Sequence, residues 1–249
     1  MQMTGNTILI TGGGSGIGRA LAESFHRLGN QVIIAGRRQT VLDDVTVANP
    51  GMMAFTVDMA DEESIKSFAE AVRTTHPKLN VVLHCAGIMQ GEDLTDPSQV
   101  TVAEDTITTN VLGPMRLTAA LMPHLLAAEN AALLTVSSGL SWVPKSVNAA
   151  YCASKAAIHS WTISLRQQLR ATGIEVIELV PPYVRTGLTG DFQANDPNAM
   201  PLEDYVSETV ALLTAGDLPQ GEVLVQRVYR QRFAYEQGHA DAVFDFLNP

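Results

Sequence analysis

A glycine-rich segment, Gly12-Gly13-Gly14-Ser15-Gly16-Ile17-Gly18, separates a short apolar run from a stretch with helical periodicity. The run at residues 7–11 is rich in isoleucine and predicts a buried strand. Apolar residues at helical spacing over residues 17–28 predict a helix that ends near Gly29. Helix N-termini at the carboxyl ends of parallel strands attract phosphate, and glycines let the backbone approach it. The order of elements therefore predicts a nucleotide-binding turn, and the alternative is a purely structural turn.

The rest of the chain repeats the alternation of apolar runs and helix-period segments. Such alternation with short connections predicts one domain, 1–249, of the Rossmann type: a doubly wound parallel sheet with helices on both faces. The further expected strands are 32–35, 80–84, 131–137, 174–180 and 222–226. The further expected helices are 62–75, 100–128 with an interruption at Gly113-Pro114, 149–171 and 205–214.

Composition excludes several functional classes. The 249 residues carry a formal net charge of -10, so a phosphate backbone would be repelled and nucleic-acid binding is not expected. Cys85 and Cys152 have neither metal-ligand nor disulfide-framework spacing, so no metal is expected. The N-terminus lacks signal-peptide features, and polar residues interrupt the apolar stretch 117–136. These features predict a cytoplasmic protein that does not enter a membrane.

The second expected strand ends in Ala35-Gly36-Arg37-Arg38. An acidic residue at this turn would bond the ribose 2′-hydroxyl of NAD, and none is present. Arg37 and Arg38 can instead pair with a 2′-phosphate, which favours NADP and leaves NAD possible. The alternative is that both arginines are solvated surface charges.

Tyr151 and Lys155 lie four residues apart at the start of an expected helix, and therefore on one helical face. A nearby ammonium favours the phenolate and should lower the tyrosine pKa, which makes the side chain a usable acid or base. Ser138 follows the strand at 131–137, so its hydroxyl faces the same crevice as the glycine loop. Together with Ser138 and the upstream glycine loop, the Tyr151–Lys155 pair becomes strong evidence for a catalytic site.

With these motifs in order and at this separation, residues 5–190 resemble the short-chain dehydrogenase/reductase family in its single-domain form of about 250 residues. The resemblance implies that Tyr151 is the general acid/base, that Lys155 lowers its pKa and bonds the nicotinamide ribose, and that Ser138 orients the substrate oxygen. It also implies that Asn110 holds a water of a proton relay. Read without the family, Asn110 is a helix-surface or kink residue.

The resemblance also implies a set of cofactor-binding residues. Asp58 matches the aspartate that contacts adenine, although it could equally cap the next helix. Thr186 matches the threonine that bonds the carboxamide. The full set is Gly12, Gly14, Ser15, Gly16, Ile17, Gly18, Arg37, Arg38, Asp58, Met59, Ala86, Gly87, Tyr151, Lys155, Pro181, Val184 and Thr186.

The chain departs from the family pattern at three places. His84-Cys85-Ala86-Gly87 replaces Asn-Asn-Ala-Gly, and we interpret His84 as structural or adenine-side and not as a catalytic base. Pro181-Pro182 replaces Pro-Gly, which removes an N–H beside the nicotinamide. An atypical tail at about 227–249 replaces the usual Val-Asp-Gly-Gly ending, which weakens inferences about tetramer contacts.

The expected substrate walls come from loops at the carboxyl ends of strands and are mostly apolar. A lid at about 187–203, which includes Leu188 and Phe192, covers them. These walls favour a hydrophobic ketone or secondary alcohol. The expected substrate contacts are Ser138, Leu140, Trp142, Tyr183 and Met89, with Gln90 and Val143 nearby. The helices 100–128 and 149–171 resemble those that form the family's dimer interface, so a homodimer or homotetramer is expected.

The combined prediction is an NADP(H)-dependent oxidoreductase that reduces a ketone or aldehyde to an alcohol, or the reverse. The alternative from another class is a catalytically silent, NADP-binding redox sensor. The intact set Tyr151, Lys155, Ser138 and Asn110 argues against a sensor, which needs only the binding half. An enoyl reductase is disfavoured because the tyrosine and lysine are four residues apart and not seven, and no long substrate region typical of an epimerase is present.

Overall fold

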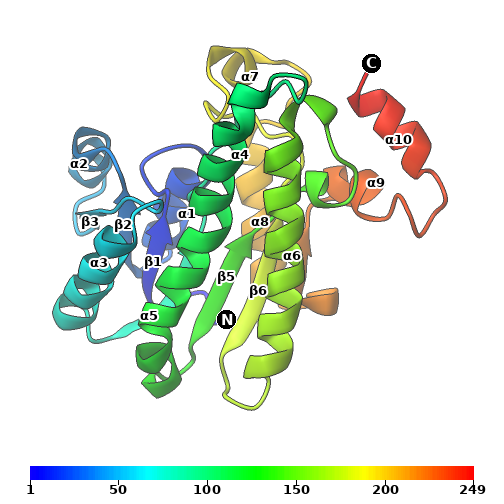
Figure 1. The fold of residues 1–249 in the computed structure, drawn as a ribbon. Coiled ribbons are helices and arrows are strands. Elements are labelled where there is room, and N and C mark those ends of the chain that lie inside the picture. The colour runs from blue at the N-terminus through cyan, green and yellow to red at the C-terminus, as the bar shows by residue number, and fades with distance from the viewer.

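The computed structural model describes all residues, 1–249, and contains one sheet of seven parallel strands in the order β3-β2-β1-β4-β5-β6-β7 (Figure 1). The strands are β1 (Thr7–Thr11), β2 (Gln31–Gly36), β3 (Met53–Thr56), β4 (Leu79–His84), β5 (Ala132–Val136), β6 (Glu175–Val180) and β7 (Glu222–Leu224). The strand order reverses between β1 and β4, which creates the crevice where ligands of doubly wound sheets bind. The predicted fold class is confirmed.

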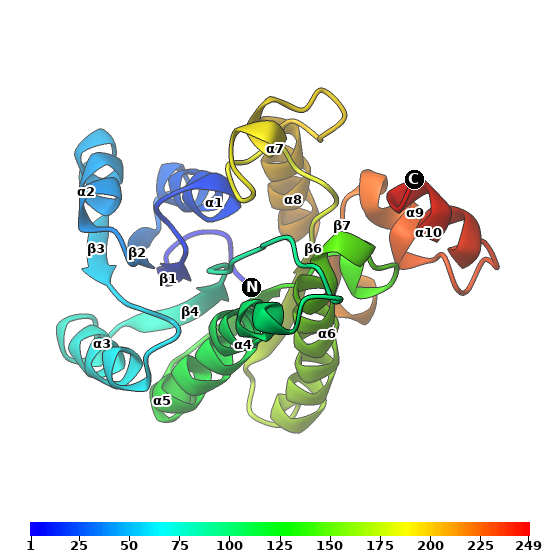
Figure 2. The ribbon, with the colours of Figure 1, turned by 45° about the horizontal axis from the view of Figure 1, so that its top comes forward.

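Helices cover both faces of the sheet (Figures 1 and 2). One layer contains α1 (Gly16–Arg27), α2 (Gln39–Ala48) and α8 (Leu202–Ala215), whose apolar residues join one core cluster. The other contains α3 (Glu62–Thr75), α5 (Gly113–Ala127) and α6 (Ala149–Leu169), whose apolar residues join the second. The sheet therefore has a hydrophobic core on each face.

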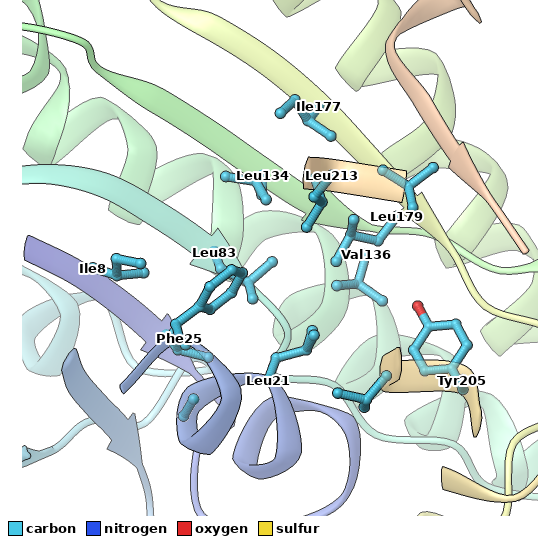
Figure 3. Packing of buried hydrophobic residues seen from close by; sticks show 14 of the residues in the cluster. Ile8, Leu21, Phe25, Leu83, Leu134, Val136, Ile177, Leu179, Tyr205 and Leu213 are labelled. Atoms are coloured by element: carbon cyan, nitrogen blue, oxygen red, sulfur yellow. The ribbon is translucent and has the colours of Figure 1, made fainter. Parts of the chain in front are cut away.

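The two cores follow from the period of two along each strand. Ile8 and Ile10 of β1 belong to one cluster, whereas Leu9 between them belongs to the other. Figure 3 shows the first cluster, where Leu21 and Phe25 of α1 and Tyr205 of α8 pack against strand residues. Complete burial of such a side chain contributes roughly 1.5–3 kcal/mol.

The long helix expected at 100–128 contains a π-helical turn directly before Gly113-Pro114. The chain runs from α4 (Val100–Ile107) through a π-helical turn, Thr108–Leu112, directly into α5. Pro114 falls in the first turn of α5, where its missing N–H costs nothing. Gly113 is required for packing, because a Cβ there would lie 2.5 Å from the Met59 carbonyl oxygen. The α-helix is therefore interrupted as predicted, but at residues 108–112 and not at Gly113-Pro114 itself.

The other expected elements are present within one to three residues of their predicted bounds, and four elements were not predicted. The unpredicted ones are α2, the edge strand β3, and two short helices of the tail, α9 (Tyr229–Arg232) and α10 (Ala240–Leu247). The segment expected to be a lid contains one further short helix, α7 (Asp191–Asn195). None of the helices is both long enough and apolar enough to cross a membrane.

Candidate active site

The glycine loop stands at the carboxyl end of β1, at the reversal of strand order. Gly12 has a φ of 71°, and a Cβ there would lie 2.8 Å from the Ala86 Cα. A Cβ on residue 18 would lie 2.4 Å from the Gly12 carbonyl oxygen. Glycine is therefore needed both for the turn and for its close packing against the end of β4.

A cleft runs from this loop along the ends of β2 and β3. Arg37 and Arg38 line it, and neither forms an ion pair with an acidic side chain. Two unpaired guanidinium groups beside a glycine loop suit a phosphate-bearing ligand. The lining residues are Gly12, Gly14, Ser15, Ala35, Gly36, Arg37, Arg38, Val41, Leu42, Val57, Met59, Ala86, Gly87, Ile88 and Thr109.

Asp58 lies between two residues that line this cleft, Val57 and Met59. Its carboxylate accepts a hydrogen bond from the Ala60 N–H at 2.9 Å. The N-cap of α3 is Asp61, whose carboxylate accepts from the N–H groups of Glu63 and Ser64. The alternative interpretation of Asp58 as the helix cap is therefore wrong.

Tyr151, Lys155 and Ser138 meet at the carboxyl end of β5. Tyr151 and Lys155 occupy successive turns of α6, and both are buried. The Lys155 Nζ lies 5.5 Å from the centroid of the Tyr151 ring and donates to the Val136 carbonyl oxygen at 2.8 Å. Ser138 lies beside the Tyr151 phenol and opposes the rise of its pKa, and the Ser138 Oγ accepts from the Leu140 N–H at 3.1 Å. The structure thus brings all three predicted residues together.

Burial shifts the two titratable groups in opposite directions. Desolvation raises the pKa of Tyr151 above its ordinary value, and the neighbouring Ser138 hydroxyl only partly opposes this. Burial lowers the pKa of Lys155 to about 8. The expected lowering of the Tyr151 pKa by Lys155 is wrong for this geometry, because desolvation of the phenolate is the largest effect.

Asn110 lies in the π-helical turn and is buried. Its Oδ1 accepts from the Ile88 N–H at 2.8 Å, and its Nδ2 donates to the Ile88 carbonyl at 2.9 Å and to the Ser154 Oγ at 3.1 Å. Asn110 therefore joins the segment after β4 to the helix that carries Tyr151. Its position in the π-helical turn agrees with the interpretation of Asn110 as a kink residue. The role of Asn110 in a proton relay stays a prediction.

The end of β4 is held without the family's asparagines. The Thr11 Oγ1 accepts from the N–H groups of Cys85 and Ala86, at 3.2 Å each. His84 Nε2 pairs with the Thr118 hydroxyl at 2.8 Å, and burial lowers the His84 pKa to about 4. A buried, neutral imidazole bonded to α5 fits the structural interpretation of His84.

The Pro181-Pro182 segment and the expected lid follow β6. The Pro181 carbonyl accepts from the Gly139 N–H at 2.9 Å, which ties the loop of Ser138 to this turn. Gln193 of α7 donates to the Val184 carbonyl at 2.8 Å and to the Thr186 hydroxyl at 3.2 Å. Thr186 packs beside the glycine loop, since a Cβ on Gly16 would lie 3.5 Å from the Thr186 Cβ.

A second cavity, of about 440 Å³, opens between this segment and the residues after β4. Met89 and Tyr183 line it as expected, whereas Ser138, Leu140 and Trp142 do not. Lys145 and Asn148 are also part of its wall and were not predicted from the sequence. Their position just before α6 is the only sequence signal that could have indicated them. The lining residues are Met89, Gln90, Gly91, Lys145, Asn148, Tyr183, Leu188, Thr189, Phe192 and Gln193.

The fold and the site define a doubly wound α/β protein with a Tyr-x-x-x-Lys centre. Residues 6–197 match the family described as short chain dehydrogenase. The "Uncharacterized oxidoreductase DltE" of Bacillus subtilis (strain 168) is 37% identical over 252 residues, which cover 100% of this chain and 98% of that protein. The chain belongs to the short-chain dehydrogenase/reductase family and is an oxidoreductase of that family.

Solved structures agree with this assignment. A short chain dehydrogenase from Burkholderia cenocepacia J2315, in complex with NADP, shares the fold with a TM-score of 0.83 at 22% identity, over 98% of this chain and 99% of that one. A short chain dehydrogenase from Shigella flexneri 2a, complexed with NADP, has a TM-score of 0.74 at 27% identity, over 82% of this chain and 90% of that one.

Proposed function

We propose that this protein reduces a ketone or aldehyde to an alcohol with NADPH. The observation that carries the proposal is the buried contact of Tyr151, Lys155 and Ser138 at the carboxyl end of β5, next to the glycine-loop cleft. A phenol, an ammonium and a hydroxyl at one point can orient a carbonyl oxygen and give it a proton.

The cleft fits an NADP(H) molecule. The glycines allow the tight turn of the loop at the N-terminus of α1, and Arg37 and Arg38 are free to pair with a 2′-phosphate. The NADP complex of the Shigella flexneri relative supports this choice. Asp58, Met59, Pro181, Val184 and Thr186 would complete the binding site. When bound, the cofactor supplies the hydride.

Each residue of the centre then has a defined task. The Ser138 hydroxyl orients the substrate oxygen, and the Tyr151 phenol donates its proton to that oxygen. The Tyr151 phenol is protonated at neutral pH, so a proton is available for the substrate oxygen in carbonyl reduction. Lys155 stabilises the phenolate that remains on Tyr151. Asn110 fixes the backbone at Ile88 and takes part in the relay that returns a proton to Tyr151.

The substrate lies in the second cavity, under the lid at 187–203. Met89, Tyr183, Leu188 and Phe192 supply apolar wall, which favours a hydrophobic carbonyl compound. Lys145 is the one charged residue that lines it, so a substrate with an additional carboxylate can also be accommodated at that wall.

The test is a panel of aryl ketones, cyclic ketones, aliphatic aldehydes and keto acids, assayed with NADPH and with NADH. We expect turnover with NADPH, and we expect Tyr151→Phe to retain cofactor binding while it loses roughly 10²–10⁴-fold in kcat. Near-wild-type turnover by Tyr151→Phe would refute the mechanism. Cofactor binding without turnover of any compound would favour a redox sensor instead.

The cofactor preference has its own test. Arg37→Asp replaces a phosphate partner with a group that bonds a 2′-hydroxyl and repels a 2′-phosphate. We expect kcat/KM to shift from NADPH toward NADH. An unchanged ratio would contradict the proposed role of Arg37.

A further inference from the structure

We propose that the C-terminal arm, residues 226–249, positions the catalytic Ser138, and that Arg232 anchors the arm for this purpose. The proposal rests on the function proposed above. The arm lies beyond the family match, which ends at residue 197, and it packs beside α6 at the β7 edge of the molecule (Figures 1 and 2).

The anchor is a buried group of charges on the last two strands. Glu178 of β6 and Glu222 of β7 are register partners on neighbouring strands, and both are buried. Arg232 donates to Glu222 through two nitrogens, with Nε–Oε2 at 2.6 Å and Nη2–Oε1 at 3.0 Å. A bidentate pair of this kind fixes both the position and the orientation of the guanidinium plane.

The second carboxylate has a different partner. The Nδ1 of His159 on α6 lies 3.0 Å from both oxygens of Glu178. His159, Glu178 and Glu222 offer ligand atoms within 4.8 Å of one another, as a metal site would. Arg232 already occupies both oxygens of Glu222, so the guanidinium supplies the positive charge that a metal ion would otherwise bring.

The fixed guanidinium supports the loop that follows Ser138. Its centre lies 4.6 Å from the Trp142 ring, and Trp142 in turn lies 4.4 Å from the His159 ring. Trp142 thus lies between the arm and α6, and it does not line the second cavity. A cation held against the face of an indole gains attraction as well as contact area.

The arm also touches the residue next to Ser138. A Cβ on Gly139 would lie 2.5 Å from the Gln231 Oε1 and 3.0 Å from the Val228 side chain. The Gly139 N–H is bonded to the Pro181 carbonyl on the other side. Gly139 is therefore held between the arm and the end of β6, and the orientation of the Ser138 hydroxyl depends on both.

The Arg232 anchor affects catalysis through the position of the Ser138 hydroxyl. Displacement of a positioned group by about 1 Å can lower a rate by about 100-fold. Loss of the Arg232 anchor should therefore reduce kcat through Ser138 and leave the cofactor cleft, which lies at the opposite part of the sheet, unchanged. Arg232 touches neither substrate nor cofactor, so it is a positioning residue.

The experiment compares Arg232→Met and Arg232→Lys with a matched control, Arg230→Met. Arg230 lies two residues away on the same arm and contacts only the Phe246 ring among aromatic groups, at 5.1 Å. The substrate is the carbonyl compound that the panel shows to be turned over fastest. We expect Arg232→Met to lower kcat about tenfold with an unchanged Kd for NADPH, Arg232→Lys to recover part of the loss, and Arg230→Met to match the wild type.

A double-mutant cycle shows whether the effect passes through Ser138. If it does, Arg232→Met has little further effect on kcat in a Ser138→Ala background. An equal loss in both backgrounds, or a wild-type kcat in folded Arg232→Met, would overturn the inference. If Arg232→Met fails to fold, Trp142→Leu removes the stack while it keeps the Glu222–Arg232 pair, and the same coupling to Ser138 is expected. Wild-type turnover by Ser138→Ala alone would instead overturn the proposed function.

Discussion

Single residues at the centre owe their chemistry to burial. Tyr151 and Lys155 lie side by side, yet desolvation keeps the phenol protonated and brings the Lys155 pKa down to about 8. A protonated phenol beside a charged lysine is the state from which a proton can be given to a carbonyl oxygen. This state exists only while Lys155 keeps its own proton.

The pH dependence of carbonyl reduction follows from these two shifts. Below about pH 8 Lys155 is charged and Tyr151 is protonated, so kcat/KM should be steady there and should fall as the pH rises through about 8. Measurement of kcat/KM between about pH 6 and about pH 10 tests this. A flat profile over the whole range would contradict the proposed role of the Lys155 charge.

His84 gives a prediction for stability. Its folded pKa of about 4 lies below the ordinary 6.5, so the unfolded chain binds more protons between these values. The free energy of unfolding should therefore decrease as the pH falls from about 6.5 toward 4. His84→Asn should remove this part of the acid sensitivity, as measured by urea unfolding at about pH 7 and about pH 5. His239→Asn, at a partly exposed position, serves as control, and equal pH dependence in wild type and His84→Asn would refute the assignment.

At the scale of elements, α7 supplies the residues by which the proposed substrate lid borders the second cavity. Gln193 is buried and holds the helix to the Val184 carbonyl, whereas Phe192 is 76% exposed although it lines the second cavity. An exposed phenyl ring beside a cavity gains contact area when a hydrophobic ligand is bound.

Phe192→Ala should therefore weaken substrate binding without destabilising the fold. Contact with a phenyl ring contributes roughly 1.5–3 kcal/mol when burial is complete, so KM for a hydrophobic carbonyl should rise by about tenfold or more. Thermal unfolding should be unchanged, as for the control Val47→Ala on α2, where the side chain is also exposed. Steady-state kinetics give the answer, and an unchanged KM would exclude Phe192 from the substrate site.

The irregular elements show where sequence patterns lose information. The π-helical turn at Thr108–Leu112 keeps helical periodicity on both sides, so nothing in the sequence distinguishes it from a regular helix. Strand β3 is short and only partly buried, and its pairing with β2 decides that it is a strand. Such elements form because neighbouring elements satisfy their backbone groups, and local propensity is secondary.

At the scale of the whole molecule, we expect association through α5 and α6. Leu126 of α5 and Ile163 of α6 are exposed apolar residues on helices that cover the same face of the sheet. Light scattering should give a homodimer or homotetramer of the 26.7 kDa chain. Ile163→Asp should shift the protein toward the monomer, whereas Val47→Asp on α2, at a more exposed position, should not. A monomeric wild type would refute the association.

The fold class, the glycine loop and the Tyr151–Lys155 pair could be predicted from sequence patterns alone. Strand alternation, glycine spacing and the i, i+4 relation are local patterns, so Tyr151, Lys155 and Ser138 could be named and the carboxyl end of β5 expected as their meeting point. The same patterns gave most strands and helices to within a few residues. These patterns could not distinguish an exposed arginine from a buried one such as Arg232.

The contacts and protonation states of these residues depend on the packed fold. The rise of the Tyr151 pKa depends on desolvation by surrounding elements, and the contact of Arg232 with Glu222 and Trp142 joins segments that are far apart in the chain. Burial and long-range pairing are properties of the packed molecule, because they depend on which surfaces exclude water together. For that reason the candidate catalytic residues could be named from the sequence, whereas their protonation states and the contacts of the C-terminal arm required the fold.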